Sequence, residues 1–95
     1  MPVQQIAADT DPARRRRTAW ALNLNETLAA NKKLNRAPST PKQLHVAIEA
    51  AGATISRQAV YSWLAGDSGP SIENQALLAR LLGVPHHMLF PVEAP

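Results

Sequence analysis

The segment from Ser56 to Gly66, SRQAVYSWLAG, places three polar side chains near the start of an expected helix. Arg57 and Gln58 directly follow Ser56, and Tyr61 comes one helical turn after Arg57. Arginine can donate two hydrogen bonds to guanine and glutamine can pair with adenine, each contributing about 1–3 kcal/mol of discrimination between bases. We therefore predict that Arg57, Gln58 and Tyr61 contact bases in the major groove of double-stranded DNA.

A second set of polar side chains surrounds the expected start of the preceding helix. Thr40, Pro41 and Gln43 form a capping-box pattern, with the proline at the first helical position. The N-terminus of a helix favours an anion, because its backbone amides are free and the helix dipole is positive there. The residues from which we expect contacts to DNA phosphates are Thr40, Lys42, Gln43, Lys32, Lys33, Arg36 and Ser62.

Four consecutive arginines, Arg14, Arg15, Arg16 and Arg17, supply a further cationic cluster. They could form an extended arm that enters the minor groove of DNA. They could equally form the first turns of a helix, where four like charges near the positive end of the dipole are unfavourable unless an anion lies close by. Solvation without any ligand is the remaining interpretation.

The charged residues are unevenly distributed along the chain. The formal net charge is +3, but nine of the ten Lys and Arg residues lie between residues 14 and 57, where only Glu26 and Glu49 oppose them. Residues 58–95 contain one arginine against three acidic residues. This asymmetry favours a polyanionic partner, either nucleic acid or an anionic membrane surface.

Length and composition argue against several other classes of protein. The 95 residues form one small domain with room for a compact helical core and little space for a deep catalytic cleft. The absence of cysteine excludes disulfides and thiolate metal sites and suits a reducing cytoplasm, so we expect a cytoplasmic, nucleoid-associated protein. No apolar run is long enough to span a bilayer.

Metal binding and catalysis have little support in the sequence. His86 and His87 are adjacent, so on a helix their side chains point about 100° apart, and no third ligand has a suitable spacing. No pairing of a nucleophile with a base is evident either. We predict no enzymatic activity, no metal, no cofactor and no small-molecule substrate.

The apolar spacing predicts the helices that position these groups. A first helix should begin near Asp11 or Pro12 and run to about Ala30, leaving Leu22 off its buried side. The residues expected in its buried stripe are Trp20, Ala21, Leu24 and Leu28. Because these apolar side chains are expected in the protein core, they are not available to insert into a membrane. Attraction of the basic residues to anionic lipid is therefore the weaker interpretation.

Further helices are expected from Thr40 to about Gly52, from Ser56 to Gly66, after Ser71, and from Pro85 to Phe90. The third helix should bury Val60, Trp63 and Leu64. The residues expected on the buried face of the fourth helix are Ile72, Ala76, Leu78, Ala79 and Leu82.

Leu77 and Leu81 lie about half a turn from that face of the fourth helix. They either meet the first or the last helix, or remain exposed as a surface for a dimer or another partner. Along the chain we expect a disordered tail over residues 1–12, one DNA-binding domain over residues 13–90 and a short tail over residues 91–95.

The pattern over residues 40–90 resembles the λ-repressor/Cro-like (XRE-type) helix-turn-helix family. The resemblance is carried by Trp63 and Gly66 in the third helix, by the Pro70–Ser71 helix start, and by the LLGV sequence ending at Val84. The segment TPKQLHVAIEAAGATIS is longer than the usual second helix and turn, and its spacing is similar to that of nucleoid-associated regulators of mycobacterial type VII secretion.

This resemblance implies a compact all-α domain of four to five helices with a λ-repressor-like helix-turn-helix. It also implies a sequence-specific regulator of transcription that binds double-stranded DNA as a homodimer, at least when on DNA. The competing hypothesis is a protein-interaction module, such as an antitoxin or an inhibitor, that uses Leu22, Leu77 and Leu81 as an apolar face. Binding that is indifferent to ionic strength would favour that alternative.

Overall fold

The computed structural model describes residues 11–91, which form five α-helices and no strand. The helices are α2 (Pro12–Lys33), α3 (Pro41–Ala50), α4 (Arg57–Ala65), α5 (Ile72–Leu82) and α6 (His86–Leu89). The predicted all-α class is confirmed over this range. Residues 1–10 and 92–95, which hold most of the two predicted tails, lie outside the described residues. Asp11 and Pro12, where the first helix was expected to begin, are the N-cap and the first residue of α2.

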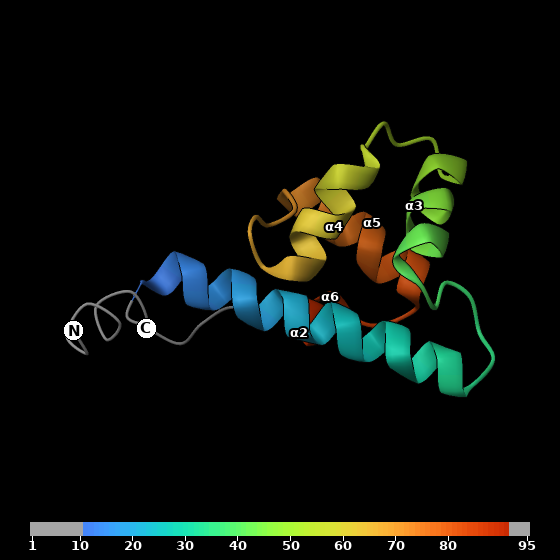
Figure 1. Cartoon of the computed structure of the whole chain (residues 1–95), viewed down its shortest axis with the longest axis horizontal. Coiled ribbons are helices and arrows are strands. Elements are labelled where there is room, and N and C mark those ends of the chain that lie inside the picture. The colour runs from blue at the N-terminus through green and yellow to red at the C-terminus, as the bar shows by residue number, and fades with distance from the viewer. Residues whose placement is uncertain (1–10, 92–95) are drawn as a thin grey trace.

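The long helix α2 lies along one side of the molecule, and α3, α4 and α5 are grouped together above it (Figure 1). Helix α4 packs against both α2 and α3, while the short α6 packs against α2 and α5. None of the helices within residues 11–91 is long and apolar enough to cross a membrane.

The start of α2 agrees with the sequence, but its end does not. The Asp11 side chain accepts a hydrogen bond from the Ala13 amide at 3.0 Å, and Pro12 occupies the first helical position. The helix continues to Lys33, one turn beyond the predicted end at Ala30. Asn31 stabilises this last turn, because its buried side-chain amide donates to the carbonyl oxygen of Pro38 at 2.9 Å.

One core unites all five helices. Its buried side chains are Leu24, Leu28, Leu44, Ile48, Val60, Trp63, Leu78, Ala79, Leu82, Leu89 and Phe90. Full burial of a large apolar side chain contributes about 1.5–3 kcal/mol, so these contacts dominate the stability of the fold. Trp20 is partly buried beside the core, and its ring meets Phe90 edge to face with centroids 5.4 Å apart.

The buried face of α5 is rotated from the predicted one. Ile72 is 78% exposed and Ala76 is also exposed, so the prediction for these two residues was wrong. Gln75 takes their place in the interior together with Leu78, Ala79 and Leu82. Its amide nitrogen donates to the Pro70 oxygen at 3.1 Å and its amide oxygen lies 2.9 Å from His86 Nε2, so the buried polar group is satisfied.

Leu77 and Leu81 are partly buried and pack against the core. Of the three leucines predicted to form an apolar partner face, Leu22 alone has a largely exposed side chain, at 57%. Leu77 and Leu81 therefore do not form a fully exposed surface, and Leu81 also lines a groove with Val46 and Ala47 of α3.

Candidate nucleic-acid interface

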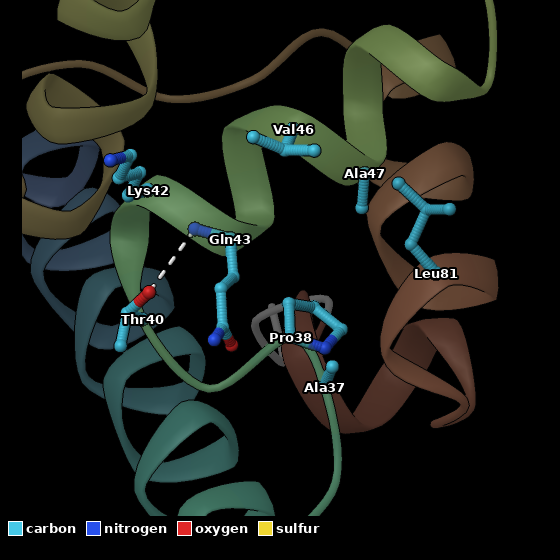
Figure 2. Close-up of a pocket in the computed structure, with 8 residues that line it drawn as sticks. All are labelled: Ala37, Pro38, Thr40, Lys42, Gln43, Val46, Ala47 and Leu81. Atoms are coloured by element: carbon cyan, nitrogen blue, oxygen red, sulfur yellow. Dashed lines mark hydrogen bonds between the residues drawn. The ribbon is translucent and has the colours of Figure 1, made fainter.

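The start of α3 has the predicted cap. Thr40 Oγ1 accepts a hydrogen bond from the Gln43 backbone amide at 3.1 Å (Figure 2). The return bond of the capping box is displaced by one residue, since Gln43 Oε1 accepts from the Ser39 amide at 2.8 Å and from the Ser39 hydroxyl at 3.0 Å. These bonds leave the side-chain NH2 of Gln43 as the group able to donate to an incoming phosphate.

The division of α4 into a packed face and an exposed face is confirmed. Ser56 Oγ caps the helix by accepting from the Ala59 amide at 3.0 Å. Val60 and Trp63 are buried. Arg57 and Gln58 lie exposed in the first turn, and Tyr61 is 46% exposed one turn further on.

The opposite end of α4 is fixed to α2. The Asn25 amide nitrogen donates both to Ala21 O at 2.8 Å within α2 and to Leu64 O at 2.9 Å in α4. Gly66 ends the helix with φ of 81°, and a Cβ there would lie 3.5 Å from the Thr18 Cα, so the two backbones approach closely. Because a helix rises about 1.5 Å per residue, Arg57 lies about 10 Å along the axis from this anchor. The start of α4 lies farther from α2 than its end does (Figure 1).

The turn between α3 and α4 is fastened by His45 of α3. His45 Nε2 lies 2.9 Å from the Ile55 oxygen, and since a carbonyl oxygen only accepts, Nε2 carries the hydrogen. The other ring nitrogen lies 3.6 Å from Glu49 Oε1. Gly52 begins the turn with φ of 90°. His45 therefore sets where α4 begins relative to α3.

Two asparagines of α2 besides Asn25 also donate to backbone oxygens of other segments. Asn23 bonds to Leu89 O at 3.0 Å, and Asn31 bonds to Pro38 O. Sequence reasoning did not assign these residues a role. The signal was present, because asparagine is a poor residue for a helix interior and three of them fall within nine positions of α2.

Several of the predicted phosphate contacts share one hollow on the surface. A shallow pocket of about 190 Å³ between the end of α2 and the start of α3 is lined by Lys32, Asn35, Arg36, Ala37, Ser39 and Gln43. Thr40, Lys42 and Gln43 also border a larger groove next to it (Figure 2). Lys33 is exposed at the end of α2 but does not line the hollow.

The remaining predicted contacts have other surroundings. Ser62 is partly buried, and its hydroxyl lies 2.7 Å from Ser68 Oγ, which ties α4 to the loop after it. Arg14, Arg15 and Arg16 are exposed in the first turns of α2, so this cluster is helical and is not an extended arm. The Arg17 stem covers Gly69, whose added Cβ would lie 3.6 Å from the Arg17 Cγ.

His86, one of the two adjacent histidines, contacts two residues of the core. His86 bonds with Gln75 and its ring centroid lies 5.5 Å from that of Phe90. Within residues 11–91 no group of three His, Asp or Glu side chains is placed to hold a metal ion.

Comparisons of the chain with protein-family models, with curated proteins and with solved structures found no match. The resemblance to helix-turn-helix domains therefore stands on residue spacing, and the case for a function stands on the geometry of α3, α4 and the hollow beside them.

Proposed function

We propose that the protein binds double-stranded DNA, with the first turn of α4 in the major groove, and regulates transcription by occupying its site. The observation that carries this proposal is the position of Arg57 and Gln58. Both are exposed in the first turn of a helix whose other end is fixed to α2. A helix presented in this way can enter a groove without exposing its packed face.

The hollow between α2 and α3 supports the same proposal. Lys32, Arg36 and Gln43 line it, and the capped N-terminus of α3 lies beside it. Cationic side chains next to a helix N-terminus suit a phosphate oxygen. Phosphate contacts of this kind would set the position of the protein on the duplex, while Arg57, Gln58 and Tyr61 read the bases.

A single reading helix contacts few base pairs. Sequence-specific regulation therefore calls for two copies, with half-sites about 34–36 Å apart along the duplex. In this proposal the protein acts as a homodimer on chromosomal DNA in the cytoplasm. Its affinity comes largely from phosphate neutralisation and its selectivity from the first turn of α4.

Fluorescence anisotropy of a labelled random-sequence duplex, titrated at several salt concentrations, tests the proposal. The logarithm of the binding constant should fall linearly with the logarithm of salt concentration, with a slope of about −0.9 per neutralised phosphate. Selection from a random duplex library then yields the preferred site. Failure to bind any duplex at low salt would contradict DNA binding.

A second candidate function, a protein-interaction module, is favoured by the larger groove. This groove has a volume of about 700 Å³, and Pro38, Val46, Ala47 and Leu81 give it an apolar lining (Figure 2). Val46 is 55% exposed. Lys42 at the rim suits an acidic segment of a partner that inserts an apolar side chain. Stoichiometric purification with a protein partner, in a complex insensitive to salt, would favour this candidate over DNA binding.

A further inference from the structure

A second groove runs between the C-terminal half of α2 and the loop that joins α5 to α6. Its volume is about 410 Å³. The residues that line it are Asn23, Glu26, Thr27, Ala30, Asn31, Leu34, Arg36, Leu82, Gly83, Val84 and Met88. Neither α4 nor α3 contributes to it, so the groove is separate from the proposed reading surface.

Large apolar side chains are exposed around this groove. Leu34 is 62% exposed and Met88 is 61% exposed. Leu22, one helical turn before Glu26 on α2, is 57% exposed. Leu82 and Val84 extend the apolar lining. Apolar side chains grouped in this way are typical of a surface that another protein covers.

The groove also carries one charge of each sign. Glu26 is the sole acidic residue within α2, and Arg36 lies just beyond the end of that helix. Both side chains line the groove, and neither takes part in an ion pair or a side-chain hydrogen bond within residues 11–91. The two charges are therefore available to a partner.

We infer that this groove is the interface with a second copy of the same chain, related to the first by a two-fold axis. In such an interface, if residue i of one copy meets residue j of the other, then j also meets i. One acidic and one basic residue on the same surface are thus self-complementary. Glu26 of each copy pairs with Arg36 of the other, and Leu34 and Met88 are buried between them.

The anchor of α4 is compatible with this dimer. The C-terminal end of α4 is bonded to α2, whereas its first turn, with Arg57 and Gln58, lies farther from α2 (Figure 1). Two copies joined along α2 keep both reading turns open. This interface supplies the homodimer that sequence-specific binding calls for, and in this respect the inference rests on the proposed function. Arg36 lies in the interface and also lines the hollow between α2 and α3.

Analytical ultracentrifugation of the full chain without DNA tests this interface. The wild-type protein should sediment with twice the 10.3 kDa mass of one chain. Glu26→Arg and Arg36→Glu should each raise the dimer dissociation constant by about tenfold or more, because each places like charges together twice. The double variant E26R/R36E should restore the dimer. Met88→Asp should weaken it without touching either charge.

The matched control is Glu73→Arg, which reverses an exposed acidic residue on α5 outside the groove and should leave the dimer intact. Circular dichroism confirms that each variant is folded. A wild-type chain that is monomeric at high concentration, or a double variant that stays monomeric, overturns the inference. A monomer that still binds duplex DNA overturns the interface alone, whereas a dimer that binds no duplex overturns the proposed function alone.

Discussion

At the scale of single residues, Arg57 is the side chain whose loss should change what the protein reads. Arg57→Ala should cost about 1–3 kcal/mol on the selected duplex and relax preference at one base pair. Anisotropy titrations on the selected site and on its single-base variants measure both effects. Arg80→Ala removes an exposed cation from α5 and serves as the control. Equal loss of affinity on every sequence would show that Arg57 contacts only the backbone.

Lys42 should behave differently from Arg57. It is exposed in the first turn of α3, next to the Thr40 cap. Lys42→Ala should weaken binding to selected and scrambled duplexes to the same degree and reduce the magnitude of the salt slope by about one. The slope is obtained from titrations over a range of salt concentrations. An unchanged slope would remove Lys42 from the phosphate-binding set.

Residue type and helical spacing were enough to predict the exposure of Arg57, Gln58 and Tyr61 and the caps at Asp11 and Thr40. They were not enough for Gln75, because a polar residue in an amphipathic pattern is read as facing solvent. The carbonyl of Pro70 and the ring of His86 make its burial favourable, and neither contact is visible in local sequence.

At the scale of elements, the turn between α3 and α4 should depend on His45. His45→Ala removes the bond to Ile55 O and should cost about 0.5–1.5 kcal/mol of folding stability. It should also reduce discrimination on the selected duplex, since the start of α4 loses its tie to α3. Urea unfolding and anisotropy measure the two effects. Glu49→Ala leaves the hydrogen bond to Ile55 in place, so it should change folding stability and discrimination between duplexes by much less.

The loop between α4 and α5 is closely packed at Gly69. A Cβ at this position would lie 2.8 Å from Trp20 Cζ3 and 3.1 Å from Cε3. Gly69→Ala should therefore displace the Trp20 ring from Phe90 and destabilise the fold by about 1–3 kcal/mol. Urea unfolding with tryptophan fluorescence detects both changes. A variant as stable as the wild type would mean that the ring shifts at no cost.

The starts of the helices could be predicted from sequence better than their ends. The starts of α2, α3, α4 and α5 were predicted, because a side chain that caps the helix stands directly before each of them. The end of α2 was placed a turn too early, because the hydrogen bond from Asn31 to the Pro38 oxygen, which stabilises the last turn, cannot be predicted from local sequence. The face of α5 was misplaced for the same reason: the deciding hydrogen bonds come from outside the helix.

At the scale of the whole molecule, the all-helical class followed from the spacing of apolar residues and glycines. The angle between α3 and α4 could not be predicted from that spacing. The six residues between the two helices are too many for a tight turn, and the bond between His45 and Ile55 sets their path. The concentration of cations between residues 14 and 57 predicted a polyanionic partner. It could not predict that Lys32, Arg36 and Gln43 would share one hollow.

The effect of salt concentration should differ between DNA binding and folding. If DNA binding depends on several phosphate contacts, raising the salt concentration should weaken binding to DNA much more than it weakens folding, because the core is apolar. Parallel anisotropy and thermal-melting series in the same buffers compare the two. Loss of binding that follows loss of helicity would mean that salt acts by unfolding the protein.

The contact from Asn25 to α4 has a consequence for the length of DNA that a dimer spans. Asn25 anchors α4, and the next residue, Glu26, lies in the groove assigned to the second copy. Neighbouring residues of one rigid helix thus determine both where the C-terminal end of α4 is held and where the two copies meet. The separation of the half-sites in an operator would then be a fixed property of α2, so variation in the number of base pairs between half-sites should be poorly tolerated.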